Sequence, residues 1–290
     1  MFQKDLFKGK KILVTGGGTG LGRSMTEKYL ELGAEVVIWG RRENILQETA
    51  EELGGPIKTQ AVDIRNADAI EAAVAEIWEE GPLHGLVNNA AGNFISPTEN
   101  LSANAFNAIA SIVFNGTFNV TNAVGKRWLH DGLKGNILSI VTTWVWTGSP
   151  FVIPSAMSKA GVAAMTQSLA VEWGPKGIRA NAIAPGPFPT KGAWDRLMPQ
   201  NAQGGVRDGE EAIPLRRYGR HEELANLAAF LMADQSEYIT GAVIPIDGGQ
   251  YLNSAGNFAG LSALTADDWQ AVRSQIQSSN AKDKSNRTAS

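Results

Sequence analysis

A glycine-rich turn near the N-terminus, Thr15–Gly22, has the spacing Gly-x-x-x-Gly-x-Gly at Gly16, Gly20 and Gly22. It follows the apolar run Ile12–Val14 and precedes a helical pattern. A diphosphate placed there meets backbone N–H groups and the positive end of the helix dipole, and glycine lets the backbone approach without a Cβ atom. We therefore expect a nucleotide site; the alternative is a flexible surface loop. The expected contacts are Gly16, Gly18, Thr19, Gly20, Leu21 and Gly22.

The end of the second expected strand indicates which nucleotide binds. The sequence there reads Ile38-Trp-Gly-Arg-Arg42, with two arginines and no acidic residue. In a dinucleotide fold this position faces the adenosine ribose, where an acid binds the 2′-hydroxyl of NAD and an arginine accommodates the 2′-phosphate of NADP. Because a guanidinium offers a phosphate a planar fork of donors, Arg41 and Arg42 predict NADPH. The alternative is a solvated start of the next helix.

Other strand ends carry further cofactor candidates. Asp63 closes the third expected strand and is placed to accept a hydrogen bond from the adenine amine. The small residues of Asn88–Gly92 close the fourth and let a cofactor ribose lie against the backbone. Pro185-Gly186-Pro187 follows a later strand and is expected to shape a wall over a nicotinamide. The expected contacts at these ends are Asp63, Asn89, Pro185, Gly186 and Phe188.

Two helical stretches offer side chains for the chemistry itself. Ser155 and Lys159 stand four residues apart, so they point the same way on one helix face. Asn115 precedes Gly116 in an otherwise apolar helical stretch. Asn–Gly inside a helix predicts a local kink, whereas an isolated mid-helix Asn is usually just exposed.

The elements that must position these residues alternate along the chain. Short β-rich runs separated by helical patterns predict a parallel sheet covered on both faces, which binds ligands at the carboxyl ends of its strands. We expect one α/β doubly wound Rossmann domain, residues 1–290, with about seven strands. The expected strands are Lys11–Thr15, Glu35–Trp39, Ile57–Val62, Gly85–Asn88, Asn136–Val141, Ile178–Ile183 and Val243–Ile246. The expected helices are Leu21–Leu32, Glu43–Leu53, Ala67–Glu79, Ala103–Gly125, Ser155–Trp173 and Glu222–Met232.

Two stretches depart from the alternation. A Gly- and Pro-rich insertion at about residues 187–215 is typical of a substrate lid, with an ordinary disordered loop as the alternative. The C-terminal extension, residues 251–290, contains the helix-start signal Thr265-Ala-Asp-Asp268 before Trp269 and apolar residues at helical spacing.

Composition excludes several classes of site. The 290 residues are 43% hydrophobic and 19% charged, which is ordinary for a globular protein. With no cysteine and three scattered histidines, we expect no disulfide, no thiolate chemistry and no metal site. A net charge of −3 does not favour nucleic-acid binding. The chain shows no bilayer-length apolar run and no signal segment, so we expect a cytoplasmic protein without membrane partners.

From about residue 8 to residue 250 the chain resembles the short-chain dehydrogenases/reductases. The glycine turn, Asp63, the Asn88–Gly92 motif, Asn115 and Lys159 carry the likeness, together with Pro185-Gly186. In that family the Asn and Lys belong to a catalytic tetrad with a Ser and a Tyr, and the Tyr stands four residues before the Lys. Here that position is Ser155, and the strand-five Ser position falls near Thr142-Thr-Trp144. The usual proton donor to a carbonyl oxygen is therefore absent.

This departure is similar to one branch, the NADPH-dependent 2,4-dienoyl-CoA reductases, which carry Ser in place of that Tyr. The stretches Asn88–Glu99, Phe151–Ala156, Ala184–Pro187 and Glu222–Leu231 resemble the branch as well. The resemblance implies that Asn93 hydrogen-bonds the thioester oxygen, that Ser155 and Lys159 hold the nicotinamide ribose and ordered water, and that Asn115 supports this network. It also implies a homotetramer. The implied acyl-CoA contacts are Arg65, Phe94, Ser102 and Arg196.

The chemistry explains how a reductase works without that Tyr. Hydride addition to a conjugated dienoyl thioester creates a dienolate, whose charge a hydrogen-bond donor such as Asn93 can hold while water protonates carbon. Mitochondrial members of the branch also have a Tyr after strand five, where this chain has Trp144 and Trp146; an indole N–H can donate but cannot act as an acid. Two alternatives stay open: a reductase of another conjugated carbonyl compound, and a catalytically silent NADP-binding protein.

Overall fold

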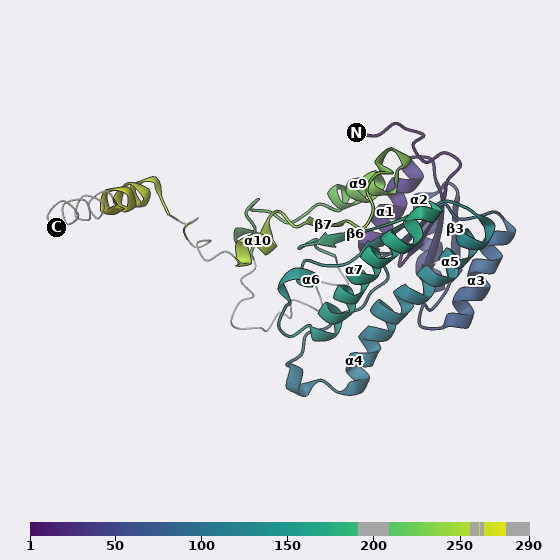
Figure 1. Cartoon of the computed structure of the whole chain (residues 1–290), viewed down its shortest axis with the longest axis horizontal. Coiled ribbons are helices and arrows are strands. Elements are labelled where there is room, and N and C mark those ends of the chain that lie inside the picture. The colour runs from purple at the N-terminus through teal and green to yellow at the C-terminus, as the bar shows by residue number, and fades with distance from the viewer. Residues whose placement is uncertain (191–208, 256–260, 262–263, 277–290) are drawn as a thin grey trace. The chain divides into compact units, whose positions relative to one another are not determined.

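The computed structural model describes residues 1–190, 209–255, 261 and 264–276 (Figure 1). By its internal contacts the chain divides into two units, Met1–Tyr251 and Leu252–Ser290. Arg196 and most of the expected lid at 187–215 lie outside the described residues. Within the described part of the chain, helices long and apolar enough to cross a membrane are absent.

The described residues form a parallel seven-stranded sheet in the order β3-β2-β1-β4-β5-β6-β7. This confirms the expected α/β doubly wound fold, and each strand lies within two residues of its expected bounds. The strands are β1 Lys11–Thr15, β2 Glu35–Gly40, β3 Ile57–Ala61, β4 Gly85–Asn88, β5 Gly135–Ile140, β6 Ile178–Pro185 and β7 Val243–Ile246.

The helices follow the expected alternation, with one informative difference. The stretch expected as one helix at Ala103–Gly125 is divided by a π-helix, Ser111–Gly116, and continues to Asp131. The main helices are α1 Gly20–Glu31, α2 Glu43–Leu53, α3 Ala67–Glu79, α4 Ala103–Ala110, α5 Thr117–Asp131, α6 Trp144–Thr147, α7 Ile153–Trp173, α9 His221–Met232 and α10 Gln250–Ala255. In the C-terminal unit, residues 266–276 are helical and the Thr265 hydroxyl accepts a hydrogen bond from the Asp268 N–H at 3.2 Å.

Helices cover both faces of the sheet (Figure 1), and the two largest apolar clusters of buried side chains lie between the sheet and these helices. In β1 the side chains alternate, so Ile12 and Val14 join the core that α1 and α9 cover, while Leu13 joins the core that α3 and α5 cover. The central strands β1 and β2 contain the apolar runs Ile12–Val14 and Val36–Trp39 because both of their faces are buried, whereas the edge strand β3 is polar and half-buried.

The sheet order changes direction at β1, which pairs with β2 on one side and β4 on the other. In an open α/β sheet such a switch point leaves a crevice at the carboxyl ends of the strands. Thr15, Gly40, Asn88 and Pro185 all stand at strand ends on that edge. The topology therefore brings the motifs found in the sequence to one edge of the sheet.

Candidate functional site

The glycine turn has a backbone that few other residues can adopt. Gly16 and Gly20 have φ angles of 67° and 53°, in the left-handed region. At Gly22 a Cβ atom would collide with the Gly16 carbonyl and the Asn89 amide. Asn89 Nδ2 donates to the carbonyls of Thr15 and Gly16 at 3.0 and 3.3 Å, which fixes the start of the turn against β4.

Two threonine hydroxyls lie within hydrogen-bond distance of the carbonyls of Gly17 and Gly18 in this turn. Thr49, from α2, donates to the Gly18 carbonyl at 2.8 Å, and Thr26, from α1, lies 3.4 Å from the Gly17 carbonyl. Thr19 is the N-cap of α1 but its side chain makes no capping hydrogen bond. The cap side chain thus leaves the N–H groups of the first helical turn for an anion, as a diphosphate site requires.

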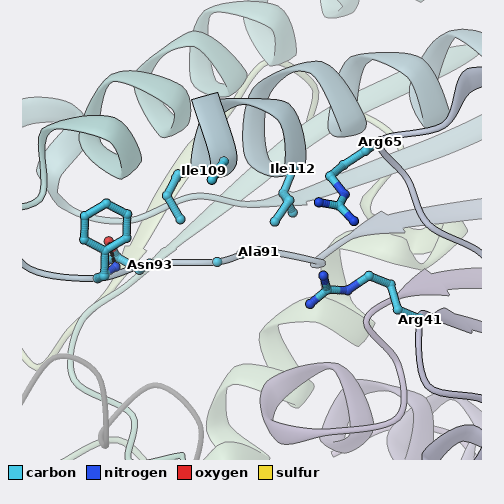
Figure 2. Close-up of a pocket in the computed structure, with 9 residues that line it drawn as sticks. Arg41, Arg65, Ala91, Asn93, Ile109 and Ile112 are labelled. Atoms are coloured by element: carbon cyan, nitrogen blue, oxygen red, sulfur yellow. Dashed lines mark hydrogen bonds between the residues drawn. The ribbon is translucent and has the colours of Figure 1, made fainter. Parts of the chain in front are cut away.

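A cavity of about 370 Å³ opens beside Ala91 and Gly92, the residues that follow β4. Figure 2 shows the guanidinium groups of Arg41 and Arg65 directed into the same space beside the Ala91 backbone. Arg65 Nε donates to Asp63 Oδ1 at 2.9 Å and to Oδ2 at 3.0 Å, and this bond holds the pKa of Asp63 below its usual range. Asp63 therefore presents a carboxylate that already carries a cation, so any adenine amine shares that acceptor with Arg65.

The other walls of this cavity are apolar. Ala108, Ile109 and Ile112 close it from α4 and the π-helix, and Phe94 lies in the lining beside Asn93 (Figure 2). Positive charge thus gathers at one part of the cavity and apolar surface at another. The arrangement suits a ligand that combines phosphates with an apolar chain.

Asn93 is oriented by its neighbour. Its Oδ1 atom accepts a hydrogen bond from the Phe94 N–H at 2.9 Å, which fixes which end of the amide is oxygen. The Asn93 side chain makes no other hydrogen bond with the described residues. The two N–H donors of Nδ2 are therefore available to a ligand oxygen. The role that the resemblance implies for Asn93, a hydrogen bond to a thioester oxygen, stays a prediction.

Ser155 and Lys159 lie one turn apart on α7 and are both buried. Lys159 Nζ donates to the carbonyl of Ile140, the last residue of β5, and burial lowers the pKa of Lys159 to about 8. Ser155 makes no side-chain hydrogen bond with another described residue, so its hydroxyl can serve a ligand. The structure brings this pair to the carboxyl edge of the sheet.

The structure places other expected site residues in local structural roles. Asn115 lies in the π-helix, is exposed, and makes no hydrogen bond with the described residues, so the structure does not join it to Lys159. A π-helix, rather than a regular α-helix, stands where the sequence predicted a kink, and Gly116 is buried against Ile64 with no room for a Cβ atom. Ser102 is the N-cap of α4, where its hydroxyl accepts from the Ala105 N–H at 3.1 Å.

Beyond β6, the expected wall segment is tightly packed. Phe188 is buried in the core, and its ring leaves no room for a Cβ at Gly219. A ligand therefore meets the backbone at Phe188. Gly186 lies so close to Asp247 that a Cβ there would come within 2.5 Å of the Asp247 Cβ. These two contacts explain why glycine stands at positions 186 and 219.

Sequence reasoning missed the helix after β5 and its aromatic partner. Trp146 of α6 stacks on Tyr251 with ring centroids 5.1 Å apart. The short WVWT segment has no helical period, and the stack joins positions about a hundred residues apart, so neither is visible in local spacing. Trp144 is half-buried in the same short helix.

Comparisons with known proteins agree with this geometry. A family model described as "Enoyl-(Acyl carrier protein) reductase" matches residues 16–250. The chain belongs to the short-chain dehydrogenase/reductase family. A solved structure of a short chain dehydrogenase from Bacillus anthracis is 44% identical, with a TM-score of 0.75 over 83% of this chain and 96% of that one. A Brucella melitensis 3-ketoacyl-(acyl-carrier-protein) reductase, solved in complex with NADH, is 27% identical, with a TM-score of 0.77 over 84% and 99%.

Two curated relatives of this short-chain dehydrogenase/reductase carry names that state an activity. The Caenorhabditis elegans "Probable 2,4-dienoyl-CoA reductase 3 [(3E)-enoyl-CoA-producing]" is 42% identical over 96% of this chain and 92% of its own length. The Bacillus subtilis "Probable 2,4-dienoyl-CoA reductase [(2E)-enoyl-CoA-producing]" is 41% identical over 84% and 97%. The chain is thus an oxidoreductase of a family that uses a nicotinamide cofactor. Among the described residues, His, Asp and Glu form no cluster that could hold a metal ion.

Proposed function

We propose that this short-chain dehydrogenase/reductase reduces a 2,4-dienoyl-CoA thioester with NADPH. The observation that carries the proposal is the place of Asn93: its amide oxygen accepts the Phe94 N–H, and the residue lines a cavity together with Arg41 and Arg65. An oxyanion donor beside a cationic and apolar cavity suits an acyl-CoA. The names of the two curated relatives support the same substrate.

The cofactor residues fit NADPH. The glycine turn and the first turn of α1 would hold the diphosphate, with contacts from Gly16, Gly18, Thr19, Gly20, Leu21 and Gly22. Arg41 and Arg42 would hold the 2′-phosphate, since both are exposed at the end of β2. The remaining proposed contacts are Asp63, Asn89, Lys159, Pro185, Gly186 and Phe188, which stand at strand ends or on α7.

The acyl-CoA would occupy the cavity beside Ala91. Arg65 would attract its phosphates, even though Asp63 neutralises part of the Arg65 charge. Phe94 would pack against the acyl part, and Asn93 would donate to the thioester oxygen. The Ser102 hydroxyl accepts from Ala105 N–H and still has a proton to donate. The resemblance adds Arg196, which lies outside the described residues.

NADPH, when bound, supplies a hydride. Hydride addition at the far carbon of the diene moves negative charge onto the thioester oxygen, where Asn93 Nδ2 stabilises it as an oxyanion-hole donor. A proton from water then completes the reduction at carbon. Lys159, protonated below a pH of about 8, adds positive charge near the ribose and holds it with Ser155. Asn115 is proposed to support this network only through its place in the π-helix.

The replacement of the usual Tyr by Ser155 favours this chemistry over ketone reduction. A ketone reductase must give a proton to an alkoxide, and Ser155 is too weak an acid for that task. A dienolate needs only a hydrogen-bond donor at oxygen, because its proton is added at carbon. The two curated relatives are named for different products, (3E)- and (2E)-enoyl-CoA, so the carbon that gains the proton differs between the two named reactions.

A steady-state assay tests the proposal. The purified protein is given NADPH or NADH with a 2,4-dienoyl-CoA, a conjugated enone without CoA, or a simple ketone, and cofactor oxidation is followed by absorbance. We expect turnover with NADPH and the dienoyl-CoA, and an enoyl-CoA product whose double bond is located by mass spectrometry. Turnover of the enone alone would favour another conjugated carbonyl substrate. NADPH binding without turnover of any substrate would favour a silent binding protein.

We further propose a cytoplasmic homotetramer. Large apolar side chains stay exposed along the π-helix, α5 and α7: Phe114, Phe118, Met157 and Val171. A row of such side chains on neighbouring helices is typical of a subunit interface. Sedimentation velocity at micromolar concentration measures the assembly, and a monomer there would contradict this part of the proposal.

A further inference from the structure

His221, the first residue of α9, lies between two segments of the cofactor site. Its Nε2 atom is 2.8 Å from the carbonyl oxygen of Pro189, and its Nδ1 atom is 3.0 Å from the hydroxyl of Ser24. A carbonyl oxygen only accepts hydrogen bonds, so Nε2 carries the proton in the neutral ring. Nδ1 is then an acceptor, and the Ser24 hydroxyl donates to it.

Both partners of this imidazole belong to segments that border the glycine turn. Ser24 lies one turn into α1, with its hydroxyl 3.3 Å from the Gly20 carbonyl. Pro189 lies in the wall segment after β6, and the next residue, Thr190, has its Cγ2 atom 3.4 Å from the place where a Cβ would stand on Gly20. The wall segment and the glycine turn are therefore direct neighbours, and His221 bonds to both sides of their junction.

The other contacts around the start of α9 do not involve His221. The start of α9 already has a capping box between Arg220 and Glu223, with the Arg220 N–H donating to Glu223 Oε2 at 2.9 Å. The interface between α9 and α1 is apolar and buried, with Leu224 among its residues. The wall segment is also held by the Gly219 N–H, which donates to the Pro187 carbonyl at 3.1 Å. His221 adds a hydrogen-bonded link between the wall and α1.

We infer that His221 is a positioning residue for the dinucleotide. Its two hydrogen bonds fix the distance between the Pro189 backbone and Ser24 of α1, so that the wall segment and the start of α1 are both correctly placed for the bound cofactor. The inference rests on the proposed function for the identity of the cofactor. His221 acts through Pro189 and Ser24 and is not placed in contact with the dinucleotide. Its loss should therefore weaken cofactor binding while leaving the cores of the domain intact.

The test compares four single variants by NADPH dissociation constant, from cofactor fluorescence, and by thermal midpoint without cofactor. His221→Ala removes both bonds. His221→Gln keeps an N–H donor at a similar reach toward Pro189. Ser24→Ala removes only the Ser24 side. His130→Ala is the matched control, because the His130 side chain is 88% exposed on α5 and its Nδ1 pairs with Asp131 at 2.8 Å.

We expect His221→Ala to raise the NADPH dissociation constant roughly five- to tenfold, the factor that one neutral hydrogen bond is worth, while its thermal midpoint stays close to that of His130→Ala. His221→Gln should recover most of the affinity, Ser24→Ala should lose less, and the double variant His221→Ala/Ser24→Ala should be no worse than His221→Ala because the two residues share one contact. If His221 had only a structural role, the thermal midpoint would fall along with the NADPH affinity, and His221→Gln would not restore that affinity.

Unchanged NADPH affinity in His221→Ala, with wild-type binding intact, overturns this inference and leaves the proposed function standing. Wild-type protein that binds neither NADPH nor NADH overturns the proposed cofactor, and this inference with it. If His221→Ala does not fold, Ser24→Ala and His221→Gln decide: wild-type affinity in Ser24→Ala together with lost affinity in His221→Gln also contradicts the positioning role.

Discussion

Lys159 and Ile140 are joined by a hydrogen bond from the Lys159 ammonium to the Ile140 carbonyl, which ties the first half of α7 to the last residue of β5. The bond anchors a buried ammonium at the carboxyl edge of the sheet, where no carboxylate of the described residues forms an ion pair with it. Burial alone lowers the pKa of Lys159 to about 8. The site therefore contains a cation that can lose its charge within an accessible pH range.

The first prediction concerns pH. Since Lys159 carries its proton below a pH of about 8, kcat should be steady near neutral pH and fall about tenfold per unit once the pH rises well above that value. The measurement is the pH profile of dienoyl-CoA reduction with saturating NADPH. Lys159→Met should nearly abolish turnover at every pH, while near-wild-type turnover in that variant would remove Lys159 from the mechanism.

Deprotonation of Lys159 cannot lower kcat at high pH by unfolding the protein. The pKa of Lys159 is lowered from 10.5 to about 8 in the folded chain, so between those values the unfolded chain binds more protons than the folded one. The contribution of Lys159 to the free energy of unfolding therefore grows as the pH rises through that window. Thermal midpoints measured at the same pH values separate a loss of chemistry from a loss of structure.

The second prediction concerns the two arginines after β2. Arg41 lines the cavity beside Ala91, whereas Arg42 is the N-cap residue of α2. Arg41→Ala should weaken both NADPH binding and acyl-CoA affinity, and Arg42→Ala should weaken NADPH binding alone. NADH binding should change little in either variant, because NADH has no 2′-phosphate. Dissociation constants for both cofactors measure this, and equal losses for NADPH and NADH would contradict the assignment.

The third prediction concerns Thr49, whose buried hydroxyl lies 2.8 Å from both the Gly18 and the Ile45 carbonyls. Thr49→Val keeps the shape but leaves the Gly18 carbonyl without this donor, which should cost about 1–3 kcal/mol of unfolding free energy and weaken NADPH binding. Thr49→Ser keeps the hydroxyl and should restore cofactor affinity. Urea unfolding and NADPH titration test both effects. A Thr49→Val variant that binds NADPH as well as wild type would show that the glycine turn keeps its conformation without the Thr49 hydroxyl.

Local patterns predicted the elements well because both faces of the central sheet are buried, so a strand such as Lys11–Thr15 contains a short apolar run, Ile12–Val14. A departure from a regular helix at Asn115–Gly116 was also predictable, since Asn and Gly disfavour a regular helix. The division of that helix into a π-turn was not, because it depends on what packs against it.

Contacts between distant positions set the rest of the site. His221 and Ser24 are 197 positions apart, and the sequence around each is an ordinary helix. Arg65 was expected at the acyl-CoA and Asp63 at the adenine, yet the structure joins the two side chains to one another. Neither spacing nor composition encodes which of two neighbouring charges faces a ligand. Ser102 is a similar case, since a helix N-cap and a ligand contact ask for the same residue type.

The fourth prediction isolates the donor on which the dienolate chemistry depends. Asn93→Ala removes the Nδ2 donors and should raise the barrier to turnover by about 2.7–4 kcal/mol, the effect of one oxyanion-hole donor. Asn93→Asp is the sharper variant. Its carboxylate can still accept the Phe94 N–H that now bonds to Oδ1, so the local backbone keeps its bond, but it has no proton to donate and adds negative charge beside the developing oxyanion.

Both Asn93 variants should bind NADPH almost as wild type does, because Asn93 lies beyond the cofactor motif at Asn88–Gly92. The measurements are kcat for a dienoyl-CoA, kcat for a simple ketone, and the NADPH dissociation constant. The Asp variant should lose at least as much turnover as the Ala variant, since a structural role for the Phe94 contact would instead leave Asp near wild type. Wild-type preference for the ketone, or full activity in Asn93→Asp, would show that charge does not develop at a thioester oxygen held by this side chain.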